Sequence, residues 1–364
     1  MNILSSLYKI YSLKNLETIK GETENLNKKI LKLSRQQNIS YSLNGKKQKI
    51  GKELLLIELE QILQTRTIER TRYYLNRLIK SLEIQKEGKI NDLNLNRWKE
   101  YQDIITDSLW IFDKRDTSGV HKADYWGNFI PQIPNQLLRR YTKKGEWVLD
   151  PFLGSGTTLI ECKRLGRNGI GVELNKQVAN SAKNNINKEK KTFKVSTEIF
   201  NGNSSTFNFR NELKKLGVNS VQFVILHPPY WDIIKFSSNK DDLSNAKTIS
   251  EFLNLFGKVV ENIYPFLDKG RYCAVVIGDK YSAGEWIPLG FYVMQEMMER
   301  GFKLKSTIVK NFEQTTAKRN QKELWRYRAL AGGFYIFKHE YIFLFQKKNS
   351  KGFKESVNNY SDDN

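Results

Sequence analysis

From about residue 130 onward, short runs of apolar residues alternate with longer segments in which apolar residues recur every three or four positions. The short runs predict buried strands, and the longer segments predict helices that pack on them. This alternation is typical of an α/β fold, so we expect a doubly wound, mostly parallel, Rossmann-like sheet. The predicted strands are 146–150, 169–173, 196–201, 221–226 and 271–278, and the predicted helices are 157–166, 175 onward, 250–266 and one through MQEMMERG. Two further runs, 304–312 and 340–348, predict a pair of strands that ends the sheet with an antiparallel strand.

The first hundred residues follow a different pattern, with helical spacing of apolar residues and almost no glycine. A polar stretch at 42–52 predicts a break between helices. We therefore expect a helical N-terminal region at 1–110, a second domain at 111–348 and a polar tail at 349–364. The first fifty residues hold ten Lys and Arg against three Asp and Glu. This region is either a helical hairpin or dimerisation arm, which we favour, or an arm that contacts a polyanion.

Composition narrows the class of protein. The 364 residues include 60 Lys and Arg against 39 Asp and Glu, a net charge of +21 that favours a nucleic-acid partner. Abundant Lys, Asn and Ile are also typical of AT-rich genomes, which would raise the Lys content without any function. Apolar content of 39%, two Cys and no long apolar run predict a folded, cytoplasmic protein without disulfides or a membrane span. The three His lack Cys partners at metal spacing, so we expect no metal site. Cys162 and Cys273 are expected to be core residues.

The segment DPFLGSGTT, residues 150–158, follows a predicted strand and opens a predicted helix. Its glycines let the backbone approach a ligand closely, and a helix N-terminus offers free amides. An ATP-binding loop would need Lys where Gly156 stands, and a dinucleotide loop would need Gly where Leu159 stands. The remaining interpretation is S-adenosylmethionine. Asp150 would face its ammonium group, and Glu173, at the end of the next strand, would bind the ribose hydroxyls.

The segment LHPPYWD, residues 226–232, follows the most apolar predicted strand and so lies at the carboxyl edge of the sheet. Two prolines fix the backbone and hold hydrogen-bond acceptors towards one point. An exocyclic amino group is a poor nucleophile, and acceptors for its two N–H groups favour the pyramidal form that can attack a methyl sulfonium. Tyr230 offers a flat face on which an extruded base can stack.

Together, DPFLGSGTT, GIGVELN and HPPYW resemble the amino-methyltransferases of DNA, which modify N4 of cytosine or N6 of adenine. The resemblance covers about 121–348. It implies catalytic roles for His227, Pro228, Pro229 and Tyr230. It implies cofactor-binding roles for Phe129, Pro131, Asp150, Phe152, Gly154, Gly156, Thr157, Glu173 and Asn203, the last standing where the family usually has an acid.

One residue departs from the family pattern. The first residue of the family's catalytic tetrapeptide is usually Asp, Asn or Ser, and in this sequence it is His227. A neutral imidazole can accept a hydrogen bond and an imidazolium cannot, so we interpret His227 as a neutral acceptor. Ser is associated more with cytosine and Asp or Asn more with adenine, so the target base stays open. A catalytically dead DNA-binding subunit and a methyltransferase of RNA or of protein glutamine are the alternatives.

The resemblance also implies partners. They are double-stranded DNA and a cognate restriction endonuclease. Separately from the resemblance, a dimerisation arm in the N-terminal helices would make a second copy of the chain a further partner. Residues 311–336 form an insertion too long for a hairpin loop, with Trp325 and Tyr327 among basic residues. We expect it to bind DNA, the alternative being a solvated helix that caps the sheet edge. Its candidate DNA-binding residues are Lys318, Arg319, Lys322, Arg326 and Arg328.

Overall fold

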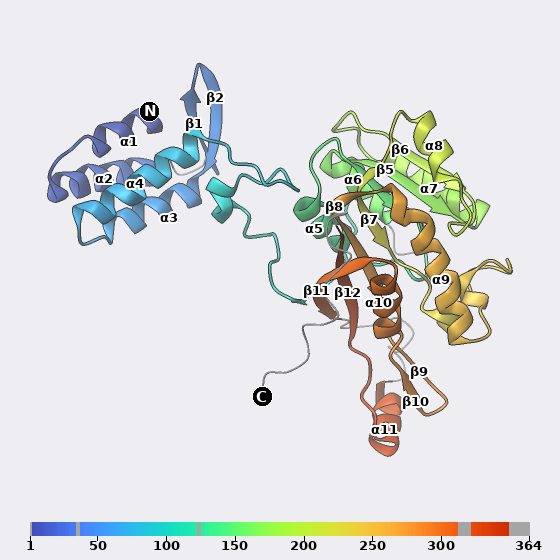
Figure 1. The fold of residues 1–364 in the computed structure, drawn as a ribbon. Coiled ribbons are helices and arrows are strands. Elements are labelled where there is room, and N and C mark those ends of the chain that lie inside the picture. Colours follow the sequence, from blue (N-terminus) through green and yellow to red (C-terminus); the bar gives the residue numbers. More distant parts are fainter. Residues whose placement is uncertain (1, 34–36, 122–124, 312–321, 349–364) are drawn as a thin grey trace, which may run out of the picture. The chain divides into compact units, whose positions relative to one another are not determined.

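The computed structural model describes residues 2–33, 37–121, 125–311 and 322–348. The chain divides into two compact units, Met1–Ile104 and Ile105–Asn364 (Figure 1). Within the described ranges, no helix has both the length and the apolar character needed to cross a bilayer.

The described residues of the first unit form four α-helices and one β-hairpin. Their bounds are α1 Ile3–Tyr11, α2 Leu16–Leu31, β1 Asn38–Leu43, β2 Lys46–Gly51, α3 Lys52–Leu63 and α4 Ile68–Glu83. Each helix contributes a fully buried aliphatic side chain to one core, for example Leu7, Ile19, Leu55 and Leu75. The expected helical N-terminal region is therefore confirmed.

The polar stretch 42–52, expected to be only a break between helices, belongs largely to the hairpin. Strands β1 and β2 pair antiparallel along their whole length. Asn44 and Gly45 form the turn with φ values of 48° and 74°. Two successive positive φ values are what a type I′ turn requires, and Asn-Gly is its preferred pair. The Asn-Gly signal was present in the sequence, but the Lys-rich β2 lacks the apolar alternation that marks a strand.

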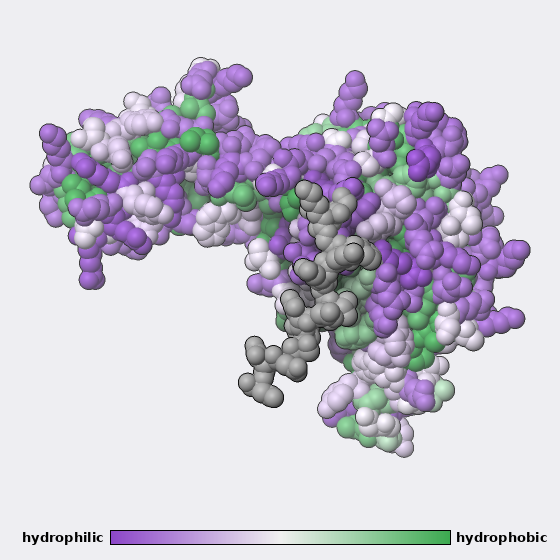
Figure 2. All heavy atoms as spheres, viewed as in Figure 1, coloured by the Kyte–Doolittle hydropathy of each residue, from purple (hydrophilic) through white to green (hydrophobic). Residues whose placement is uncertain are grey.

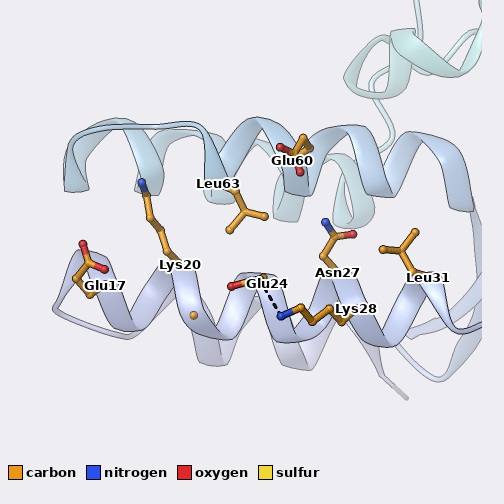
Figure 3. A pocket seen from close by; sticks show the side chains of 9 residues that line it. Glu17, Lys20, Glu24, Asn27, Lys28, Leu31, Glu60 and Leu63 are labelled. Atoms are coloured by element: carbon orange, nitrogen blue, oxygen red, sulfur yellow. Dashed lines mark ion pairs between the residues drawn. The ribbon is translucent and has the colours of Figure 1, made fainter.

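An open groove of about 500 Å³ lies between α2 and α3 of this unit (Figure 3). Lys28 pairs with Glu24 at 2.8 Å along its floor. None of the motifs singled out in the sequence lies here. The groove is lined by Glu17, Lys20, Gly21, Glu24, Asn27, Lys28, Leu31, Glu60 and Leu63.

The described part of the second unit is built on an eight-stranded sheet of order β3-β11-β12-β8-β7-β4-β5-β6. The run from β8 to β6 is parallel, and β12 is antiparallel to both of its neighbours. This confirms the doubly wound, mostly parallel sheet with an antiparallel last strand. The strands are β3 Leu109–Trp110, β4 Trp147–Asp150, β5 Asn168–Glu173, β6 Thr197–Asn201, β7 Val221–Leu226, β8 Leu267–Ile277, β11 Phe302–Asn311 and β12 His339–Lys347.

Helices cover both faces of this sheet. Helices α8, α9 and α10 share one core with the strands, and α6 and α7 share another around Leu159 and Ile186. Helix α5 lies beside α6. Both predicted core cysteines are buried, Cys162 in α6 and Cys273 in β8. The helices are α5 Gln132–Tyr141, α6 Thr157–Leu165, α7 Lys176–Lys188, α8 Phe209–Lys215, α9 Ile249–Ile263, α10 Leu289–Glu299 and α11 Lys322–Gly332.

The strand order places the motifs. After β4 the chain adds β5 and β6 on one side, and it then returns to place β7 and β8 on the other side of β4. The loops that follow β4 and β7 therefore flank the point where the strand order reverses. In doubly wound sheets this point, at the carboxyl ends of the strands, is where ligands bind.

Candidate active site

The Gly-rich loop 150–156 is held in its shape by close packing. Gly154 and Gly156 have φ values of 54° and 89°, which favour glycine. A Cβ atom on Gly156 would lie 2.7 Å from Cδ1 of Ile186 in α7. Thr157 then begins α6, whose first amides have no partner within the helix. The loop is therefore a tight turn that presents a helix N-terminus.

Asp150 lies beneath this loop, with only 1% of its surface exposed. Its Oδ2 accepts a hydrogen bond from the hydroxyl of Thr158 at 2.6 Å, and its Oδ1 accepts one from the amide of Phe152 at 3.0 Å. Burial raises the pKa of Asp150 to about 7, and these two hydrogen bonds oppose the shift. Asp150 thus shapes the loop; a contact with a ligand ammonium group stays a prediction.

Glu173, at the end of β5, is joined to the same loop. Its Oε2 accepts a hydrogen bond from the amide of Gly154 at 2.9 Å, and its Oε1 accepts one from the amide of Asn175 at 2.8 Å. Burial raises the pKa of Glu173, and the two amides counteract it. Each carboxylate oxygen has a second lone-pair direction, so the group can still accept from a diol.

Asn203 lies on the neighbouring loop after β6. Its Oδ1 accepts hydrogen bonds from the amide and the hydroxyl of Ser205 at 2.9 and 2.8 Å. Ser204 donates to the carbonyl of Pro151 at 2.6 Å, which ties this loop to the Gly-rich loop. The structure therefore brings Asn203 near the predicted cofactor residues. The side-chain oxygen of Asn203 is already used to hold the turn at Ser205.

Residues 125–131 connect the Gly-rich loop with HPPY. Tyr125 lies against Gly154, where an added Cβ would be 3.2 Å from the Tyr ring. Asn128 accepts a hydrogen bond from the hydroxyl of Ser155 at 2.5 Å. Phe129 is buried and its ring lies 4.8 Å from that of His227, centroid to centroid. Pro131, also buried, is the N-cap residue of α5.

The HPPY segment directly follows β7. His227 and Tyr230 are partly buried, and Pro228 between them is buried. Nε2 of His227 lies 3.3 Å from the hydroxyl of Tyr230. Burial lowers the pKa of His227 to about 4; Lys310 lowers it further and Glu340 opposes the shift. The imidazole is therefore neutral near pH 7, which a hydrogen-bond acceptor at this position requires.

The backbone after HPPY adopts an unusual conformation. Trp231 has a φ of 50°, which is rare for a bulky residue and is found where surrounding contacts impose it. Its indole N–H donates to the carbonyl of Ala246 at 2.8 Å. The ammonium of Lys280 lies 4.1 Å from the ring centroid and also pairs with Asp232. These contacts hold the chain that leaves the HPPY segment.

Two charged residues of the site were missed from the sequence. Glu340 begins the apolar part of β12 and is 3% exposed, and Lys310 on β11 is 5% exposed. Their charged groups lie 3.1 Å apart, on residues paired across the two strands. Glu340 also accepts a hydrogen bond from Tyr230 at 2.7 Å. The available signals were Glu340 directly before the apolar run of β12 and Lys310 near the end of β11, a strand that also carries Lys303 and Lys305.

A family model described as DNA methylase matches residues 14–184 and 221–364, well over half of the chain. This protein belongs to the DNA methylase family. The matched ranges contain DPFLGSGTT, Glu173 and HPPY. Family membership supports S-adenosylmethionine as the cofactor, and the Gly-rich turn, the helix N-terminus and the poised Glu173 are consistent with it.

Individual relatives match parts of this DNA methylase. It is 32% identical over 168 residues to the type II methyltransferase M.MjaII of Methanocaldococcus jannaschii, covering 44% of this chain and 28% of that protein. It is 37% identical over 103 residues to the type II methyltransferase M2.DpnII of Streptococcus pneumoniae, covering 27% of this chain and 35% of that protein. The chain thus spans about a third of the length of the curated relatives it matches. A SAM-dependent methyltransferase structure from Methanosarcina mazei is 14% identical, with a TM-score of 0.39 over 58% of this chain and 97% of that one.

The described part of the basic insertion, which contains α11, lies beside a small hairpin, β9 Lys280–Ser282 and β10 Glu285–Ile287 (Figure 1). The ring of Phe334 stacks on Tyr281 at 4.2 Å, and Phe337 lies 4.1 Å from Trp286. Hydrophobic residues gather at the end of this projection (Figure 2). In the described part of the insertion, Tyr327, Leu330 and Tyr335 are strongly exposed.

The predicted DNA-binding residues are described only in part. Arg326 and Arg328 are exposed on α11, and the guanidinium of Arg328 lies 5.3 Å from the ring of Trp325. Lys318, Arg319 and the side chain of Lys322 lie outside the described residues, as does the tail at 349–364. Elsewhere in the described ranges, no three His, Cys, Asp or Glu residues cluster as metal ligands would.

Proposed function

We propose that this DNA methylase transfers a methyl group from S-adenosylmethionine to the exocyclic amino group of an extruded base in duplex DNA. The observation that carries the proposal is the position of residues 125–129. They touch the Gly-rich loop through Tyr125 and Asn128, and they touch the HPPY segment through the contact of the Phe129 ring with the His227 ring. A cofactor held by the loop and a base held by HPPY would therefore share one site.

The residues present suit this reaction. Bound cofactor supplies an electrophilic methyl sulfonium. The base amino nitrogen bonds to the methyl carbon, the carbon–sulfur bond breaks with its electron pair going to sulfur, and the nitrogen releases a proton to water. His227, neutral because burial lowers its pKa to about 4, accepts one N–H of the amino group. The two prolines fix the backbone around this contact, so little reorganisation is needed during transfer.

The proposal extends to the atom that is methylated and to the biological role. We propose N4 of cytosine or N6 of adenine as the acceptor and modification of host DNA beside a restriction endonuclease as the role. Both partial relatives named above carry the printed name type II methyltransferase, which supports this role. Hydrogen-bond acceptance by His227 suits either amino group.

The test is transfer of tritium from labelled S-adenosylmethionine to unmodified duplex DNA, tRNA and protein extract, each offered separately to the purified protein. We expect label in DNA, and nucleoside mass spectrometry of the product will identify the base. His227→Ala should lose transfer while it retains S-adenosylhomocysteine binding, and His339→Ala serves as a matched histidine control. Label found only in tRNA or only in protein would mean that this acceptor, and not DNA, is the substrate. DNA retention without transfer would indicate a binding subunit.

A further inference from the structure

A chain of four polar side chains runs from the catalytic segment into the sheet. Nε2 of His227 lies 3.3 Å from the hydroxyl of Tyr230, which lies 2.7 Å from Oε2 of Glu340. Oε1 of Glu340 lies 3.1 Å from the ammonium of Lys310. Gly278 at the end of β8 leaves room for the Tyr230 ring, because a Cβ there would be 3.0 Å from it. The chain therefore joins β7, β12 and β11 at one edge.

The proton positions along this chain follow from chemistry. An ionised carboxylate only accepts hydrogen bonds, and the Lys310 ammonium stabilises the charge on Glu340. The single hydroxyl proton of Tyr230 is therefore donated to Glu340. The Tyr230 oxygen can then only accept from Nε2 of His227. A neutral histidine carries one ring proton, so placing it on Nε2 leaves Nδ1 bare.

We propose that Glu340, held by Lys310, fixes the tautomer of His227 through Tyr230, so that Nδ1 is the atom that accepts the amino group of the target base. Lys310 and Glu340 are positioning residues, since neither would touch the base. The part concerning the base rests on the proposed function, whereas the tautomer does not. Nδ1 is bonded to Cγ, as is the side-chain oxygen of Asn or Asp, so it offers an acceptor at the same distance from the backbone.

The tautomer can be read directly. Long-range proton–nitrogen NMR of protein labelled at histidine nitrogen distinguishes a protonated from a bare ring nitrogen. The sequence contains three His, and the His227→Asn spectrum assigns the signal. We expect a protonated Nε2 and a bare Nδ1 for His227 near pH 7. The opposite tautomer, or an even mixture, would overturn the proposal whether or not the protein methylates DNA.

The positioning role is tested with the double variant Lys310→Met/Glu340→Leu. Replacing both members of a buried ion pair by apolar residues is commonly tolerated, whereas removing one leaves an unpaired charge. Without Glu340, the Tyr230 proton should turn towards His227 Nε2 and drive the ring proton to Nδ1. We expect the tautomer to invert and methyl transfer to fall about tenfold or more, with S-adenosylhomocysteine affinity unchanged. An unchanged tautomer would show that Glu340 does not set it.

A matched control is the ion pair of Arg271 in β8 with Glu146, which directly precedes β4, at the opposite edge of the same sheet. Arg271→Met/Glu146→Gln disturbs this pair without touching the catalytic segment. It should retain both the tautomer and the transfer rate. An equal loss of rate in this control would mean that the first double variant acts only through stability.

The acceptor atom is tested separately by substituting His227. Asn places its oxygen where Nδ1 lies, and Gln places its oxygen one bond further out, near Nε2. If Nδ1 accepts the amino group, His227→Asn should retain more transfer activity than His227→Gln. The reverse order would overturn the assignment of Nδ1. If the wild-type protein transfers no methyl group to any acceptor, the proposed function fails and the NMR result still decides the tautomer.

Discussion

The proton on Asp150 offers a direct test of how the cofactor is held. Burial raises the pKa of Asp150 to about 7. About half of the free protein is therefore protonated there at pH 7, and about nine-tenths at pH 6. A cationic group close to a carboxylate lowers its pKa by about one to three units. If the ammonium group of the cofactor lies beside Asp150, ligand binding must expel this proton.

The expected magnitude follows from these values. Taking a bound-state pKa of about 5, binding releases about half a proton at pH 7, about 0.8 at pH 6 and about 0.1 at pH 8. Because the ligand prefers the ionised carboxylate, affinity should rise with pH up to about 7 and then level off. The contribution of Asp150 to folding stability depends on pH in the opposite direction, because it falls as pH rises. The raised pKa of Asp150 in the free protein gives stability that is complete below about pH 4 and lost as pH rises through about 7.

The assay is calorimetry of S-adenosylhomocysteine binding in two buffers with different ionisation enthalpies, since the difference in heat counts the protons released. Asp150→Asn should abolish the release, and 5′-methylthioadenosine, which lacks the ammonium group, should show none with the wild-type protein. Zero release at pH 7, or the same release in Asp150→Asn, would refute the reasoning. Asp150 would then serve only to shape the loop through Thr158 and Phe152.

Further outcomes can be measured on the same protein. Since burial lowers the pKa of His227 to about 4, its neutral form persists through pH 6–8; the transfer rate should fall only below about pH 5, and His227→Asn should lack that acid limb in single-turnover profiles. Glu173→Ala should weaken S-adenosylhomocysteine binding about ten- to hundredfold by calorimetry, because one or two charge-assisted hydrogen bonds to the ribose are lost; unchanged affinity would contradict the assignment. Gly156→Ala should lower the unfolding free energy by about 2 kcal/mol in denaturant titrations, since it adds a positive-φ penalty to the collision with α7. If Arg326 reads a base, its Ala variant should lose about 1–3 kcal/mol on cognate DNA only, whereas a phosphate contact at Arg328 would lower the salt slope by about 0.9 on any duplex; two unaffected variants would leave α11 outside the DNA interface.

Much of the catalytic unit could be predicted because local sequence decides it. Strand β7 is apolar except for Gln222 and is buried at its other five positions, and Asn175 accepts hydrogen bonds from the first-turn amides of α7. Gly154 and Gly156 occupy backbone conformations that the Gly-rich spacing already suggested. Each of these signals lies within a few residues of the structure it specifies.

Other elements could not be predicted because their signals are weak or distant. The short helix α8 and the hairpin β9–β10 each span too few residues for a clear period. The contact of Glu340 with Tyr230 joins residues 110 positions apart. It exists because β12 inserts between β8 and β11, and no local pattern in β12 determines which strands become its neighbours.

The buried ion pair also has an energetic meaning. Burying an ion pair such as Lys310 and Glu340 costs desolvation energy that can exceed the attraction between the charges, and an apolar pair is often as stable or more stable. Fold stability alone therefore gives no reason for burying these two charges. Their position at the end of a hydrogen-bonded chain from His227 does give one. A histidine in place of a carboxylate or amide has two possible acceptor atoms, and only a fixed external acceptor for the Tyr230 proton makes one of them reliable.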